Sequence, residues 1–97
     1  MQISIKLRDG FSNSAVNIRV DGAEVYSKSA VSTDLTISFA DKIEVPVQKA
    51  RVSLEVSVVG GPTGSVAVSP GETPFVDVAI VDGVMSLRVS KTETPML

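Results

Sequence analysis

Apolar and polar residues alternate with a period of two along most of the chain. The longest clean example is RVSLEVSV at 51–58, in which every second residue is Val or Leu. Such alternation is typical of strands that bury one face. No window keeps the i, i+3, i+4, i+7 apolar spacing of a helix. The pattern predicts further strands whose inward residues are Ile3, Ile5 and Leu7; Val16, Ile18 and Val20; Leu35, Ile37 and Phe39; Ile43, Val45 and Val47; and Val66 and Val68.

Turn signals separate these runs. Asp21-Gly22 and Asp82-Gly83 predict two-residue hairpins, because Gly accepts the positive φ of a type I′ turn and Asp tolerates it. GGPTG at 60–64 and PGETP at 70–74 are the strongest breaks. Pro46 lies inside a predicted strand but cannot donate a ladder hydrogen bond, which predicts an edge strand.

The number and spacing of these elements predict an all-β fold. With 97 residues the chain suits one domain. About seven to nine short strands, with a turn every 8–12 residues, are typical of a β-sandwich, and a small barrel is the alternative. We therefore expect a single antiparallel β-sandwich of the immunoglobulin/prealbumin-like kind over residues 1–90. Residues 91–97 are expected to form a flexible C-terminal tail.

The stretch at 75–81, FVDVAIV, departs from the alternation, because it is apolar on both faces except at Asp77. A central strand covered on both sides, a subunit interface, or ordinary exposed apolar residues would each explain it. The interface explanation predicts a docking surface formed by Val78, Ile80, Val84 and Met85. Asp77 is expected to point outward to solvent, since an inward carboxylate would need a partner such as Arg88 or Arg19.

Charge and composition narrow the function classes. The nine Lys and Arg residues are scattered and the net charge is −2, so neither nucleic acid nor an anionic membrane is an expected partner. There is no Cys, and MQISIKLRDG at the N-terminus lacks the continuous apolar stretch of a signal peptide. A cytoplasmic location is therefore expected.

The sequence offers few residues suited to catalysis or to metal binding. The chain has no His and no Cys, which removes the commonest general base, the thiolate nucleophile and the commonest transition-metal ligands. Asp9, Asp21, Asp41 and Asp82 all occupy turn-like positions, and no D-x-D-x-[DN]-G loop is present. With no Trp and 4% aromatic residues, the chain offers few platforms for a sugar or a base. We predict no catalytic, cofactor-binding or metal-binding residues.

Residues 16–22, VNIRVDG, followed by AEVY at 23–26, resemble the opening hairpin of small β-sandwich accessory modules of the carboxypeptidase-regulatory-like and PEGA types. The resemblance covers about residues 15–89. It lacks a preceding Pro-x-Gly-Ala and a Gly-Tyr corner, and Thr73-Pro74 lies far from the hairpin. The resemblance implies a non-catalytic spacer, binding or assembly unit and assigns no functional residue.

Together these observations predict a non-enzymatic structural or protein-interaction module. Its expected partner is a protein, with a second copy of the chain included. A calcium- or small-ligand-binding module is the alternative, because loops at one end of a sandwich can gather oxygen ligands. An enzyme subunit or hydrolase ranks behind it.

Overall fold

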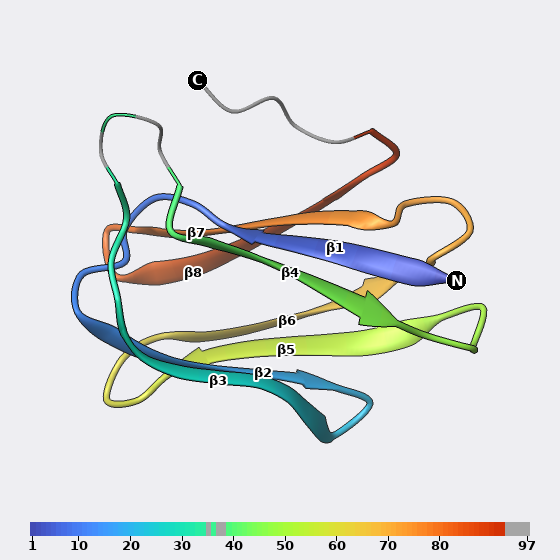
Figure 1. Cartoon of the computed structure of the whole chain (residues 1–97), viewed down its shortest axis with the longest axis horizontal. Helices are drawn as coiled ribbons and strands as arrows, with labels where there is room; N and C mark the ends of the chain where they lie inside the picture. Colours follow the sequence, from blue (N-terminus) through green and yellow to red (C-terminus); the bar gives the residue numbers. More distant parts are fainter. Residues whose placement is uncertain (35, 37–38, 93–97) are drawn as a thin grey trace.

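The computed structural model describes residues 1–34, 36 and 39–92, and the regular structure in this part of the chain is entirely β. It forms eight strands, as the sequence predicts, although the strand expected over 35–39 falls mostly on residues outside those described. The strands are β1 (Gln2–Leu7), β2 (Ser14–Val20), β3 (Ala23–Val31), β4 (Asp41–Pro46), β5 (Val52–Val58), β6 (Thr63–Val68), β7 (Phe75–Val81) and β8 (Val84–Ser90) (Figure 1).

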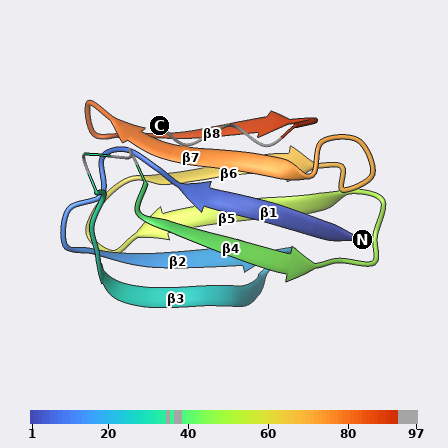
Figure 2. The same cartoon turned by 45° about the horizontal axis from the view of Figure 1, so that its top comes forward.

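The strands form two sheets of four. Sheet A has the order β4-β1-β7-β8 and sheet B has the order β3-β2-β5-β6. Figures 1 and 2 show the two sheets as facing layers. The expectation of a purely antiparallel domain is wrong at one pair, because β1 and β7 run parallel, with Ser4 opposite Phe75 and Leu7 opposite Val78. The chain passes through all of sheet B before β7 returns beside β1, which permits this parallel pairing.

The core lies between the sheets. Each fully buried Val, Leu or Ile side chain there contributes about 1.5–3 kcal/mol to stability. Most of the predicted inward residues are in this core, whereas Ile43, Val58 and Val66 are only half-buried at its margin. Phe39, which was also predicted to point inward, is half-buried and does not belong to the core. The buried apolar residues are Ile3, Ile5, Leu7, Phe11, Val16, Ile18, Val20, Val31, Val45, Val47, Val52, Leu54, Val56, Val68, Val76, Val78 and Met85.

The two open sides of the layered structure are closed differently. Where β6 meets β8, a Cβ on Gly64 would lie 2.5 Å from Leu87 Cδ1 and 2.8 Å from Met85 Cγ, so a larger residue would force these side chains to move. Where β3 meets β4, the Tyr26 hydroxyl donates a hydrogen bond of 2.7 Å to Asp41 Oδ2, and Lys28 Nζ lies 3.5 Å from the same oxygen. Both contacts join sheet A to sheet B.

The edge strands β4 and β3 differ in how clearly the sequence marks them. Val47 N–H donates to Met1 O, so alternate residues of β4 bond to β1 and the position of Pro46 faces the outer edge, as predicted. Strand β3 has no apolar alternation, because it is an edge strand whose residues are largely exposed. Its pairing with β2 is irregular at two places, and Ala30 has a φ of 58°. Such irregularities protect an exposed edge from further pairing.

Both predicted hairpins are present. Asp21 and Gly22 have φ values of 50° and 84°, and Asp82 and Gly83 have values of 52° and 76°. Two consecutive positive φ values define the type I′ turn that matches the strand twist. The second turn fixes the register of β7 against β8, with Val81 opposite Val84. Among the described residues, no helix has the length and apolar character needed to cross a membrane.

Candidate functional site on the outer face of sheet A

The four residues of the predicted docking surface do not share one surface. Val78 is fully buried, Met85 is 9% exposed and Ile80 is half-buried, and all three face sheet B, whereas Val84 is 64% exposed on the opposite side. The reason is the pleat: Ile80 pairs with Met85 on the inner face, so the neighbouring pair Val81–Val84 must point outward. The predicted surface is therefore wrong in three of its four members.

Strand β7 is apolar on both faces because it lies inside sheet A, between β1 and β8. Val76 and Val78 point into the core, and the outward residues Phe75, Asp77 and Ala79 are half-buried. Asp77 points outward, as expected. Asp77 forms an ion pair with Arg8, at 3.9 Å between Arg8 Nη1 and Asp77 Oδ2, and the two side chains are only 14% and 18% exposed.

A row of charged residues crosses the outer face of sheet A. The pairing of β4 with β1, of β1 with β7 and of β7 with β8 aligns these residues. It places cations on both sides of the Asp77 carboxylate. Lys6 in this row is only 4% exposed although its side chain is charged. The residues of the row, strand by strand, are Lys42 on β4, Lys6 on β1, Asp77 on β7 and Arg88 on β8.

Arg8 reaches this face because the chain continues beside β7 after β1 ends. Arg8 N–H donates to Val78 O at 2.8 Å, and Ile80 N–H donates to Asp9 O at 2.9 Å. The chain then turns at Gly10, where φ is 91° and a Cβ would lie 2.1 Å from the Ile80 carbonyl oxygen. Any other residue would be both strained and in collision there. Gly10 thus allows Arg8 and Asp9 to stay beside Ala79.

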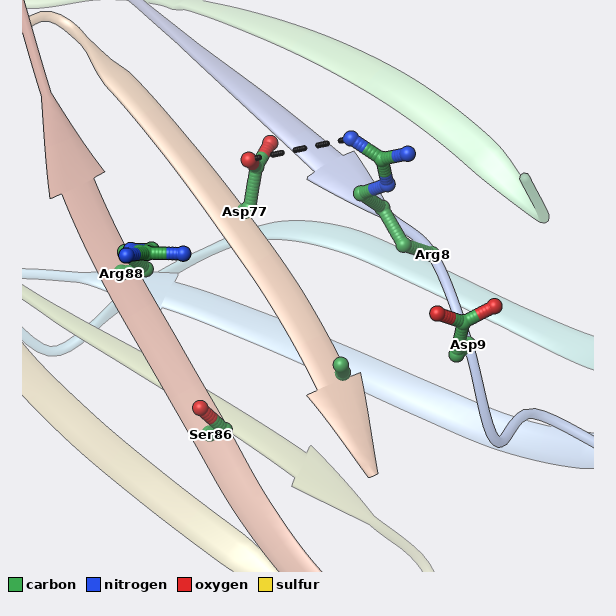
Figure 3. Close-up of a pocket in the computed structure, with 6 residues that line it drawn as sticks. Arg8, Asp9, Asp77, Ser86 and Arg88 are labelled. Atoms are coloured by element: carbon green, nitrogen blue, oxygen red, sulfur yellow. Dashed lines mark ion pairs between the residues drawn. The ribbon is translucent and has the colours of Figure 1, made fainter. Parts of the chain in front are cut away.

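These side chains surround a hollow of about 220 Å³, lined by Arg8, Asp9, Asp77, Ala79, Ser86 and Arg88. Figure 3 shows the Asp77 carboxylate between the side chains of Arg8 and Arg88, with Ser86 further along β8. Ala79 pairs with Ser86, and these small side chains leave space between the longer ones. The exposed pair Val81 and Val84 lies two residues further along the same two strands.

The groups around the hollow suit anion binding better than bond-breaking chemistry. Arg8 and Arg88 each carry a planar guanidinium with five N–H donors, and Ser86 adds a hydroxyl. Within the described part of the chain, Arg88 pairs with no carboxylate. None of the lining residues is His or Cys, so Ser86 has no conventional base beside it.

The turn aspartates have structural roles. Asp21 accepts a 2.8 Å hydrogen bond from Ser53 N–H, which together with Lys49 lowers the pKa of the Asp21 carboxyl. At Asp41, partial burial opposes ionisation, but hydrogen bonds from Tyr26 and Lys42 N–H outweigh it and lower the pKa. Among the described residues, no three or more acidic side chains gather in a way that could hold a metal.

Comparison with known protein families, curated proteins and solved structures gave no match to this chain. The resemblance to PEGA-type and carboxypeptidase-regulatory-like modules therefore stays a prediction.

The sequence analysis did not identify Arg8, Ser86 or Arg88 as site residues. Arg8 and Arg88 are 80 positions apart and come together only through the parallel pairing of β1 with β7. The available signal was Asp77, the single charge in an apolar strand, since such a residue needs partners from neighbouring strands.

Proposed function

We propose that this protein is a non-enzymatic β-sandwich module that binds a protein segment on the outer face of sheet A. The observation that carries the proposal is the hollow between Arg8 and Arg88, with the exposed pair Val81–Val84 two residues further along β7 and β8. Two facing four-stranded sheets support the sandwich class. The immunoglobulin/prealbumin-like subdivision stays a prediction.

The size of the hollow favours a protein partner over a small metabolite. Sites for small molecules commonly enclose about 300–1,000 Å³, whereas this hollow measures about 220 Å³ and lies on a sheet face. It would hold one side chain of a larger partner. Val81 and Val84, at 57% and 64% exposed, would add apolar contact beside it.

A second copy of the chain is the other candidate partner, and sedimentation distinguishes it from a different protein. Stable dimers bury about 800 Å² on each side, and two valines at a hairpin tip supply only a small part of such an area. Self-association would therefore need further contacts from the sheet face. Sedimentation of the purified protein in the selection buffer shows whether this occurs.

A random-peptide display selection tests the proposed function. Peptides selected on the full chain are measured against the double variant Val81→Ser/Val84→Ser. The matched control is Val59→Ser, because Val59 is 77% exposed in the turn between β5 and β6, away from the hollow. We expect binders that lose about tenfold in affinity on the double variant, as is common when interface anchors are removed. The same binders should be unaffected by the control.

Two results would contradict the proposed function. One is a selection without binders from repeated, diverse libraries. The other is a set of binders that respond equally to Val59→Ser and to the double variant, because their site would lie elsewhere. Thermal unfolding of each variant confirms that the fold is retained, which is expected since all three valines are exposed.

A further inference from the structure

We propose that two copies of this chain associate through the outer edge of β8, so that sheet A continues from one subunit into the other. The two β8 strands pair antiparallel about a two-fold axis at Leu87. This inference goes beyond the proposed function, because it concerns the edge of sheet A and not its outer face.

Strand β8 is the least protected edge of the two sheets. In the described part of the chain its strand neighbour is β7 alone (Figure 2), and its seven residues pair with β7 without a register shift. By contrast, β3 is irregular and β4 carries Pro46 at its outer edge, and both features hinder further pairing. Edge strand β6 contains Gly64, which has no side chain to pack against an added strand. An additional strand therefore fits best beside β8.

The backbone of β8 directs a regular set of hydrogen-bonding groups to this edge. The even-numbered residues of β7 bond towards the β1 side, as the hydrogen bonds of Val78 O and Ile80 N–H show. The odd-numbered residues of β7 therefore bond to β8, where they pair with the even-numbered residues. The N–H and C=O groups of Met85, Leu87 and Val89 are left to face the outer edge, and they form a ladder that a second strand can join.

A two-fold axis at Leu87 makes this ladder complementary to itself. Leu87 then lies opposite Leu87 of the partner subunit, and Met85 lies opposite the partner's Val89, so each outward N–H meets a C=O. This register aligns the whole strand with its copy, because Val84 and Ser90 are equally far from Leu87. The inward side chains of Leu87 and Val89 are only half-buried in one subunit, and the added strand would cover them further.

The outer face of β8 supports the same register. Ser86 lies opposite Arg88 of the partner subunit, in a pair whose backbones do not bond to each other and whose side chains are therefore close. The two arginines are offset along the strands, so like charges do not face each other. An axis at Arg88 would place arginine opposite arginine, which is unfavourable. An axis at Ser86 would leave one end of each β8 strand unpaired.

Sedimentation velocity of the full chain measures this association. Pairing of single edge strands gives an interface at the low end of the size range for protein complexes. We therefore expect a weak dimer with a dissociation constant on the order of 100 µM. A series from about 10 µM to about 1 mM protein covers the transition from monomer to dimer.

Two substitutions at Ser86 have opposite expected effects on the dissociation constant. Ser86→Glu places a carboxylate opposite the partner's Arg88 and should tighten the dimer about fivefold, whereas Ser86→Lys places a cation there and should weaken it about fivefold. Both effects oppose the general influence of net charge, because the chain carries −2 and added Glu increases the repulsion between copies. Ser86 is exposed, so both variants should keep the fold.

The matched controls are Ser65→Glu and Ser65→Lys, which make the same charge changes on β6. Ser65 is exposed on the outer face of sheet B, and β6 is the edge strand that lies nearest to β8 in the other sheet. These controls should alter the dissociation constant by less than about twofold. Effects as large as those at Ser86 would show that β6 forms the interface, and they would overturn the inference.

A second pair of variants tests the backbone contact itself. Val89→Pro removes an N–H that faces the outer edge, whereas Val89→Ala shortens the same side chain but keeps this N–H. The proline variant should be monomeric at about 1 mM, and the alanine variant should dimerise about threefold more weakly than the unchanged chain. Pro46 shows that an edge strand of sheet A accommodates an outward-facing proline. Circular dichroism checks the fold, and the Ser86 variants decide the matter if Val89→Pro does not fold.

Amide hydrogen exchange locates the interface independently. The amides of Met85, Leu87 and Val89 should be unprotected at about 10 µM and become protected at about 1 mM, while those of Ser86 and Arg88 are protected at both. Protection of all of them at about 10 µM would overturn the inference, because the edge would then be covered within one subunit. A chain that stays monomeric at about 1 mM would overturn it too, as would Ser86 variants that shift the dissociation constant in the same direction.

Discussion

The outer faces of the two sheets carry charged rows of opposite polarity. In sheet A a carboxylate lies between cations, and in sheet B a cation lies between carboxylates. The row of sheet A is Lys42–Lys6–Asp77–Arg88, and the row of sheet B is Glu24–Arg19–Glu55–Ser65. The same alternating sequence pattern thus yields two faces with different electrostatic character.

Burial separates the two rows further. Lys6 is 4% exposed and Asp77 is largely shielded, whereas Arg19, Glu24 and Glu55 are all exposed. Exposed ion pairs contribute about 0–1 kcal/mol, and shielded charges depend much more on their partners. The sheet B row therefore serves mainly as a solvated surface, while the sheet A row is an organised cluster beside a hollow.

The largest difference in stability between the two rows is expected from a substitution at Asp77, the central carboxylate of the sheet A row. Asp77→Asn removes the carboxylate that pairs with Arg8 and lies between Lys6 and Arg88 in the row, and it should lower the free energy of unfolding by about 2 kcal/mol. The matched change in sheet B, Glu55→Gln, leaves Glu24 beside Arg19 and should alter it by less than about 0.5 kcal/mol. Urea unfolding followed by circular dichroism measures both. Equal losses would show that the two rows do not differ.

A smaller effect is expected at the Tyr26–Asp41 hydrogen bond, which joins β3 of sheet B to β4 of sheet A. Burial, and then the hydrogen bond to the Asp41 carboxylate, raise the pKa of Tyr26 above its ordinary value of 10.0. Because the folded state favours the neutral phenol, this contribution to stability is present below pH 10 and decreases as the pH rises above it. Tyr26→Phe removes one partly exposed hydrogen bond and should cost about 1 kcal/mol.

The titration can be read without interference, because Tyr26 is the single tyrosine and the chain has no Trp. We expect the tyrosinate absorbance of the folded protein to appear at higher pH than that of the protein in urea. Asp41→Asn keeps an acceptor but removes the charge, so it should narrow this gap without closing it. A folded protein that titrates like the unfolded chain would contradict the Tyr26–Asp41 contact.

Much of the fold could be predicted because its signals are local. Alternation placed Ile5, Ile18 and Leu54 in the core, Asp-Gly located both hairpins, and Pro46 identified an edge. Strand β3 was predicted only through the Asp21-Gly22 hairpin that precedes it, because an exposed edge strand has no apolar alternation of its own. The parallel pairing of β1 with β7 was missed because no local signal records which distant strands become neighbours.

The site was predicted less well, because it too depends on which distant strands become neighbours. Apolar character alone grouped Val78, Ile80 and Met85 with Val84, although the pleat places only Val84 outside. Docking beside the second hairpin stays a prediction, and the structure shows only that its tip exposes Val81 and Val84. The arginines on either side of Asp77 are brought together only by tertiary pairing, so the charge pattern of the sequence could not identify them.

The most direct test of the central claim maps the binding face at residue resolution. Amide resonances of the ¹⁵N-labelled chain are followed while a peptide from the display selection is added to about 1 mM, which detects even weak complexes. We predict that the shifts concentrate at Arg8, Ala79, Ser86 and Arg88, with Arg19 and Ser57 on the outer face of sheet B unchanged. Shifts centred on sheet B, or no shifts at any residue, would contradict the account.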